Sequence, residues 1–312
     1  MRVGDTDSVL HMQERVNMIL RVKAPTFLRA NTPLLDCSYK WFSTEEICII
    51  LERLNSLIFL GDNMLRDIYG AFNILLRGNL ALGALSQWEM DDQKLCSIPF
   101  TSPFNLVELI FQHRRKACRC DAQFTNTDCH EHFVNNSTSI MSHDHLSRHP
   151  SPFFCPSATS PEHSYIPITS FPIPPIALKD VASIFLRLKT NPSRKTIPII
   201  FHVGLSLLFS WPQTADMMSS IASVLEEVAP NTKYKPIVLW LNPAAAGHLK
   251  PPGSILQQGN EAIWGFSQEM EQEARRRGWE VLGMWNATVQ EQSWDGSNYG
   301  NAFVKYDILI VH

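Results

Sequence analysis

The sequence lacks any apolar run long enough to cross a lipid bilayer, since a membrane-spanning helix needs about 20 predominantly apolar residues. It also lacks a signal peptide in its first 27 residues. There, Asp5, Asp7 and Glu14 interrupt the apolar core that such a peptide requires. Taken literally, these two absences predict a cytoplasmic protein with no membrane span.

A sustained basic run is also missing. The chain of 312 residues carries 27 Lys and Arg against 30 Asp and Glu, for a net charge of −3. Binding to nucleic acid or to an anionic membrane depends on a basic patch, so we expect neither as the main partner. The hydrophobic fraction of 45% is typical of a globular protein, and the length allows one α/β domain with a substantial core.

Two features favour the secretory pathway instead of the cytoplasm. Most of the seven cysteines lie in polar, loop-like sequence, where a reduced thiol gains little from burial: Cys96, Cys118, Cys120, Cys129 and Cys155. The segments 135–138 and 286–288 also fit the N-glycosylation sequon. A shortened gene model, missing a leader and a last helix after the apolar run 308–311, would reconcile them with the missing signal peptide. Both compartments stay open.

Segment 118–145 holds a cluster of cysteines and histidines, and the spacing of these residues indicates whether they could bind a metal. Its pairs are Cys-x-Cys at Cys118 and Cys120 and His-x-His at His130 and His132. Structural zinc sites favour Cys-x₂₋₄-Cys pairs, so disulfides account for the cysteines better than a metal does. We expect no metal and no cofactor.

Helices and strands alternate over most of the chain. A capping box at 43–46 opens a predicted helix, and an apolar strand at 56–60 leads through Gly61-Asp62-Asn63 into a helix at 64–77. Further helices are predicted at 180–189, 213–228 and 260–277, and strands at 197–202, 236–241 and 280–284. The alternation predicts one domain over 1–312, a three-layer α/β sandwich with a mostly parallel sheet.

The middle of the chain differs in kind. From 96 to 176 the sequence is rich in Cys, His, Ser and Pro and shows no steady period, and 150–175 is dense in proline. This composition predicts an irregular insertion or lid-like segment that is extended or disordered around the prolines.

The candidate site lies where the strands end, because ligands of parallel α/β sheets bind beyond the carboxyl ends of the strands. Gly61-Asp62-Asn63 follows the first strand, and His202-Val203-Gly204 follows a later one. An apolar strand ending in Gly-Asp-x before a helix presents residue x at the rim of the sheet, where a serine would be an exposed nucleophile.

These residues carry a family resemblance. The block Gly61-Asp62-Asn63 resembles the Gly-Asp-Ser block of the SGNH/GDSL hydrolases, and the segment 294–300, Trp-Asp-Gly-Ser-Asn-Tyr-Gly, resembles the Asp-Gly-x-His-Tyr-Gly block of their PC-esterase-like branch. That branch includes polysaccharide O-acetyltransferases and esterases. The resemblance implies an SGNH-type fold, an acylated carbohydrate as substrate, no cofactor, and a catalytic triad drawn from these two blocks.

The departures from the family pattern decide what activity to expect. Asn63 occupies the position of the family serine and Asn298 that of the family histidine, leaving Asp295 as the surviving triad member. An amide is neither a nucleophile nor a base near neutral pH. Losing a triad member costs about 10⁴- to 10⁶-fold in turnover, so the resemblance implies a weakened or inactive acyl-ester hydrolase or O-acetyltransferase. The alternative is a non-catalytic carbohydrate-binding or scaffolding protein.

The remaining candidates have structural interpretations as well. The residues assigned to substrate or oxyanion binding are Gly61, Asp62, Arg66, His202, Gly204 and Asn260. The Gly-Asp-Asn turn and Asn260 also fit helix capping, and Arg66 fits a salt bridge. His202 is either a borrowed base or a satisfied histidine at a strand end. Ser206 is interpreted as structural, because its segment lacks the closing glycine of a nucleophile elbow.

Overall fold

The computed structural model describes residues 44–77, 83–85, 122–125, 129, 132–140, 162–188, 196–228 and 236–288. All of them belong to one compact unit that begins at Trp41. Predictions that concern other residues, including Asp295 and Asn298, lie outside the described part of the chain.

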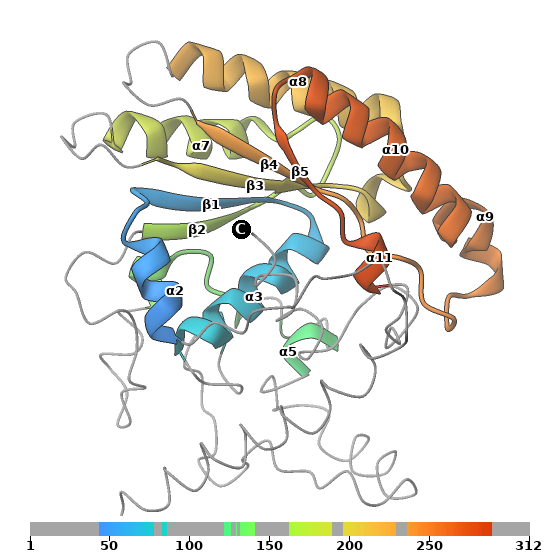
Figure 1. The fold of residues 1–312 in the computed structure, drawn as a ribbon, viewed down its shortest axis with the longest axis horizontal. Helices are drawn as coiled ribbons and strands as arrows, with labels where there is room; N and C mark the ends of the chain where they lie inside the picture. Colours follow the sequence, from blue (N-terminus) through green and yellow to red (C-terminus); the bar gives the residue numbers. More distant parts are fainter. Residues whose placement is uncertain are drawn as a thin grey trace, which may run out of the picture. The chain divides into compact units, whose positions relative to one another are not determined.

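The centre of the molecule is a five-stranded parallel sheet in the order β2-β1-β3-β4-β5 (Figure 1). The strands are β1 (Ser56–Gly61), β2 (Glu162–Pro167), β3 (Pro198–His202), β4 (Ile237–Leu241) and β5 (Glu280–Leu282). Along the chain, β2 is added on one side of β1 and β3 on the other. The direction of winding therefore reverses between β1 and β3.

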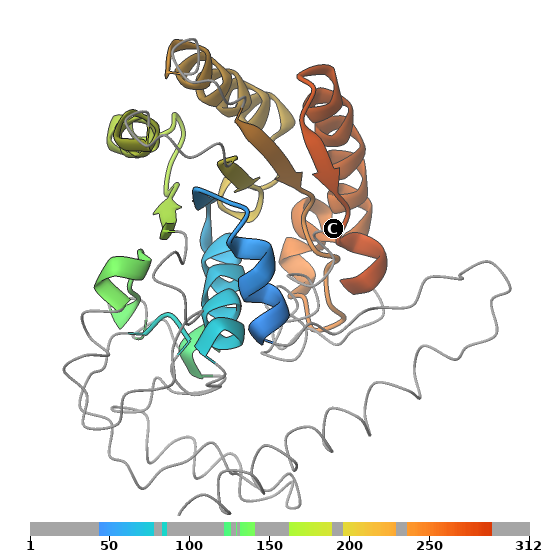
Figure 2. The same ribbon diagram turned by 60° about the vertical axis from the view of Figure 1, so that its left-hand side comes forward.

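Helices cover both faces of this sheet. On one face lie α2 (Thr44–Leu51) and α3 (Asn63–Arg77), and on the other lie α7 (Pro175–Leu188), α8 (Trp211–Val228) and α10 (Asn260–Arg276) (Figures 1 and 2). The short elements are α5 (Ala122–Thr125), η2 (Leu205–Leu207), η4 (Pro252–Ser254), α9 (Ile255–Gln258) and α11 (Trp285–Thr288). The predicted three-layer α/β architecture with a parallel sheet is confirmed.

The two helical layers are held by alternate residues of the strands. In β1, Ile58 and Leu60 are fully buried against the layer of α7, α8 and α10, whereas Leu57 and Phe59 are buried against α2 and α3. Burying each such side chain stabilises the fold by about 1.5–3 kcal/mol. Every residue of β1 is buried, so its sequence is a nearly continuous apolar run. The predicted strand therefore matches the observed one within one residue.

Strand β2 corrects the prediction of an irregular segment at 96–176. Its residues include Glu162, His163 and Ser164, which are polar but largely buried. Backbone groups of the strand bond to side chains of other segments: the Oγ of Ser56 donates to the carbonyl of Glu162 (2.8 Å), and the backbone N–H of His163 donates to the Oγ of Ser137 (3.1 Å). The strand was missed because polar residues hid its apolar pattern.

The helix that follows β2 also begins earlier than predicted, at Pro175 instead of residue 180. Proline suits this first position, because its missing N–H would have no intrahelical acceptor there. In the described part of the chain, no helix is both long enough and apolar enough to cross a membrane.

Candidate functional site

The candidate site lies at the carboxyl ends of β1 and β3. In a parallel sheet whose winding reverses between two strands, the loops leaving those strands diverge and open a crevice, and ligands bind there. The loops in question are Asp62-Asn63, which leads into α3, and the segment that follows His202. The sequence placed its main candidates in these two loops.

Asp62 is the residue that ties the two loops together. Its carboxylate is buried, with 4% of the residue exposed. One oxygen, Oδ1, accepts a hydrogen bond from the N–H of Met64 (3.2 Å), and the other, Oδ2, accepts one from the N–H of Gly204 (3.1 Å). The hydroxyl of Ser206 also lies 3.4 Å from Oδ2. Asp62 therefore caps α3 and anchors the loop after β3 with a single side chain.

The buried side chain of His202 also lies beside the carboxylate of Asp62. Its Nδ1 lies 2.7 Å from the carbonyl oxygen of Leu241, which can only accept, so Nδ1 carries a proton. Its Nε2 faces Oδ1 of Asp62 at 3.7 Å, and the residue has no exposed surface. Both nitrogens face protein atoms, so this geometry gives His202 a positioning role and not that of a base borrowed by the substrate.

Asn63 is the exposed residue of the first loop. It begins α3 directly after the buried Asp62 and is exposed beyond the end of β1. Its Oδ1 lies 3.5 Å from Nη1 of Arg66. Arg66 is itself buried, forms an ion pair with Asp67 (2.8 Å) and lies over the ring of Phe133, so it supports the first turn of α3 from inside.

Gly61 has a packing role. A Cβ at this position would collide with the carbonyl oxygen of His202 on the neighbouring strand, so only glycine fits. Tyr165 of β2 donates its hydroxyl to the carbonyls of Gly61 and Asp62 (3.1 Å each). Burial, with the negative charge of Asp62, raises the pKa of the Tyr165 hydroxyl, which keeps it a neutral donor. Tyr165 was not among the predicted site residues, because its strand was missed.

Gly204 was a candidate for an oxyanion donor, but its N–H is occupied by Asp62. The loop that it opens continues through the 3₁₀ turn η2 and two residues in the left-handed region, Leu208 (φ 50°) and Phe209 (φ 56°). Non-glycine residues rarely adopt this conformation, and each such residue costs about 1–3 kcal/mol. The loop is therefore bent sharply, with Ser206 exposed at its tip.

Asn260 lies at the same edge of the sheet, farther along, at the start of α10. Its Oδ1 accepts from the N–H of Ala246 (2.8 Å) and its Nδ2 donates to the carbonyl of Ala246 (3.1 Å). Thr288 of α11 accepts from the N–H of Ala245 (2.7 Å) and donates to Met284. The amide of Asn260 is thus committed to holding the loop after β4.

The remaining predictions for the site and its surroundings are only partly placed. Asp295 and Asn298 lie outside the described residues. Of the Cys/His cluster, the structure describes Cys129 and His132, and within its described ranges it contains no group of side chains suited to hold a metal ion. Cys48 and Cys129 are both disulfide-bonded.

The described part of the site can bind polar groups but offers no base to a residue at position 63. Its exposed groups are the amide of Asn63 and the hydroxyl of Ser206, and the buried carboxylate of Asp62 bonds to both loops that carry them. Together they define an α/β protein with a polar site at its topological switch point.

Comparison with known proteins yields neither a matching protein-family model nor a matching curated protein. Similar solved structures exist. One is a carbohydrate acetylesterase from Sinorhizobium meliloti, with a TM-score of 0.31 and 16% identity over 46% of this chain and 71% of that chain. Another is the aryl esterase of M. smegmatis, with a TM-score of 0.37 and 12% identity over 81% of this chain and 94% of that chain. An acetyl-xylooligosaccharide esterase from Geobacillus is similar at a TM-score of 0.32 and 8% identity, over 82% and 92%.

Proposed function

We propose that the chain is a homologue of the SGNH/GDSL acyl-ester hydrolases and O-acetyltransferases, of the PC-esterase-like branch, and that it binds acylated carbohydrate. The observation that supports this most is the first loop. A fully buried central strand ends in Gly61, and the buried Asp62 anchors the adjacent loop. Asn63 then emerges exposed at the start of α3. This is the placement that a nucleophile at position 63 would need.

The residues at the family's catalytic positions limit what the site does. In this lineage a serine attacks the acyl carbonyl, a histidine carries the proton, and water or a glycan hydroxyl accepts the acyl group. Asn63 and Asn298 supply neither function, and Asp295 then has no histidine to orient. Turnover through this triad is therefore weakened or absent, and Asp62 and His202 keep the shape of the site.

A non-catalytic role in carbohydrate binding or scaffolding is the second candidate. The exposed amide of Asn63 favours it, because an amide donates and accepts hydrogen bonds as sugar hydroxyls require. For the compartment, we propose the secretory pathway. The disulfides at Cys48 and Cys129 support it, since disulfides persist in oxidising compartments.

Hydrolysis of p-nitrophenyl acetate and of acetylated xylan tests the proposal. The proteins to compare are the wild type, Asn63→Ser and the double variant Asn63→Ser/Asn298→His. We expect activity to rise by several orders of magnitude only in the double variant, because nucleophile and base act as a unit. A folded double variant as inactive as the wild type would contradict the proposed triad positions.

A further inference from the structure

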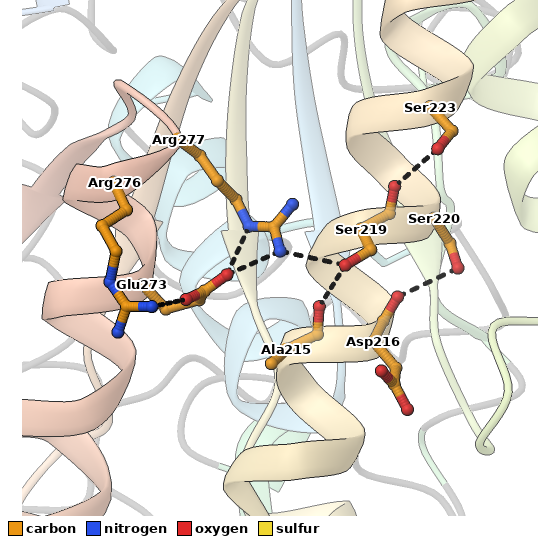
Figure 3. Close-up of polar contacts among 8 residues, drawn as sticks. All are labelled: Ala215, Asp216, Ser219, Ser220, Ser223, Glu273, Arg276 and Arg277. Atoms are coloured by element: carbon orange, nitrogen blue, oxygen red, sulfur yellow. Dashed lines mark hydrogen bonds and ion pairs between the residues drawn. The ribbon is translucent and has the colours of Figure 1, made fainter.

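The hydroxyl of Ser206 differs in its partner from those of the serines on α8. On α8, Ser219, Ser220 and Ser223 donate to backbone carbonyls one turn earlier, at 2.9, 3.0 and 3.0 Å (Figure 3). Such bonds satisfy the hydroxyl within its own helix. The hydroxyl of Ser206 instead lies 3.4 Å from Oδ2 of Asp62. A hydroxyl beside a carboxylate can donate a hydrogen bond to it, and a carboxylate in this position can take the proton of a serine that attacks a carbonyl.

The carboxylate is backed by a histidine. Oδ1 of Asp62 faces Nε2 of His202 at 3.7 Å, and Nδ1 of His202 is fixed by the carbonyl of Leu241 at 2.7 Å. The chain thus holds a hydroxyl, a carboxylate and an imidazole in contact at the switch point of the sheet. The order differs from a serine–histidine–aspartate triad, because here the carboxylate lies in the middle.

The loop holds Ser206 at the edge of the sheet. Gly204 has no room for a side chain, because its Cβ would lie 2.9 Å from the ring of Phe209. Phe209 and Leu208 adopt positive φ, and the ring of Phe209 packs against Phe266 (5.3 Å). Strain of this kind persists only where the surroundings enforce it, and it is common beside functional residues.

Donors for an oxyanion are also at hand. The backbone N–H groups of Leu205 and Ser206 begin the 3₁₀ turn, and among the described residues neither has an acceptor. Unpaired N–H groups beside a nucleophile can stabilise the negative charge that develops on the carbonyl oxygen.

We propose that Ser206 is a nucleophile of this chain, with Asp62 as its base, in place of the residue missing at position 63. The inference rests on the proposed acyl-ester chemistry. Oγ of Ser206 attacks the acyl carbon while its proton passes to Oδ2 of Asp62. The tetrahedral intermediate then breaks its bond to the sugar oxygen, which takes that proton. Water attacks the resulting acyl-Ser206 ester through Asp62 in the same way, releasing the carboxylic acid and restoring Ser206.

A fluorophosphonate probe tests the nucleophile without any ester substrate. The wild type, Ser206→Ala and Asp62→Asn would be incubated with the probe, and labelled peptides identified by mass spectrometry. Ser223→Ala is the matched control, because Ser223 is exposed but donates to a helix carbonyl. We expect the wild type to be labelled at Ser206, Ser223→Ala to match it, and Ser206→Ala to lose at least about 100-fold in labelling rate. Thermal melts would verify that each variant is folded.

The outcomes separate this inference from the proposed function. Labelling at Ser206 in a wild type that hydrolyses no acetyl ester would uphold the nucleophile, contradict its role in ester hydrolysis and leave the proposed binding of acylated carbohydrate standing. Ester hydrolysis by the wild type that the Ser206→Ala variant retains would uphold the proposed function and contradict Ser206 as its nucleophile. An absence of labelling in the wild type, or labelling of another serine, would overturn the assignment of Ser206. Slow labelling of folded Asp62→Asn would support the carboxylate as base, whereas an unchanged rate would contradict that role.

Discussion

Polar side chains lie beyond the carboxyl ends of the strands, and their hydrogen bonding differs between the β1/β3 end and the β4/β5 end of this edge of the sheet. At the β4/β5 end, the side chains of Asn242, Asn260 and Thr288 are bonded to Trp240, Ala246 and Ala245, respectively. At the β1/β3 end, Asp62 is similarly committed, but the side chains of Asn63 and Ser206 remain exposed beside it.

This difference shows which polar residues at a strand end are free to meet a ligand. A side chain whose donors and acceptors already close a loop contributes to stability, and binding a ligand through it would require breaking those bonds. The β4/β5 end is of this kind. Among the described residues of these loops, exposed polar side chains lie beside a buried carboxylate at the β1/β3 end, so we propose that the functional site lies there.

The largest expected effect comes from Asp62→Ala. This change leaves the buried N–H of Gly204 without its acceptor and removes the cap of α3 at Met64, so we expect the free energy of unfolding to fall by about 2–4 kcal/mol. Urea denaturation measures it. Asp62→Asn, which keeps one carbonyl oxygen, should lose less. A loss below about 1 kcal/mol for Asp62→Ala would mean that the two loops are held together in another way.

Acid sensitivity is expected from the buried histidine of β2. Burial lowers the pKa of His163 from 6.5 to about 3. Between these values only the unfolded chain binds the proton, so the free energy of unfolding falls as the pH falls. The slope is about 1.4 kcal/mol per pH unit, or about 2 kcal/mol between pH 6.5 and 5.

Urea denaturation at pH 7, 6 and 5 tests this assignment. The variant His163→Gln cannot titrate there, so its stability should be lower at pH 7 but flatter toward pH 5 than that of the wild type. Equal pH slopes for the two proteins would contradict the assignment of the acid sensitivity to His163.

The sequence predicted the parts of the fold whose residues follow a clear period. Strand β1, helix α3 and helix α10 were located within one or two residues, because their apolar positions repeat as a buried strand or an amphipathic helix requires. Strand β2 was missed, because polar residues interrupt its apolar pattern and its backbone groups bond to side chains 26 or more positions away in sequence. Such long-range pairing leaves no local pattern.

In the candidate site, too, the local motif was predicted from the sequence and the long-range contacts were not. The turn at 61–63 was recognised from its local motif, but the bonds from Asp62 to Gly204 and Ser206 join positions more than 140 residues apart. Ser206 was therefore interpreted as structural, since its own neighbours in sequence do not form a nucleophile elbow. The carboxylate partner that distinguishes it becomes visible only in three dimensions.

A moderate effect is expected for Asn260→Ala at the β4/β5 end. The change removes two hydrogen bonds to the exposed loop at Ala246, and we expect a loss of about 1 kcal/mol in urea denaturation. Binding of an acetylated xylo-oligosaccharide, measured by calorimetry, should be unchanged. Weaker binding in a variant that keeps its loop would show that this end also contacts the ligand, which would break the comparison.

The smallest change in stability is expected for Ser206→Ala, within about 0.5 kcal/mol, because the residue is exposed and its one side-chain contact is long. Asp62 keeps the N–H groups of Met64 and Gly204, so the loop should stay in place. Urea denaturation should therefore give nearly the wild-type midpoint. A residue that stabilises the fold so little, yet controls reaction with a serine-directed probe, would be held in its strained loop for chemistry. A large loss of stability would instead make it a structural residue, as its sequence neighbours suggest.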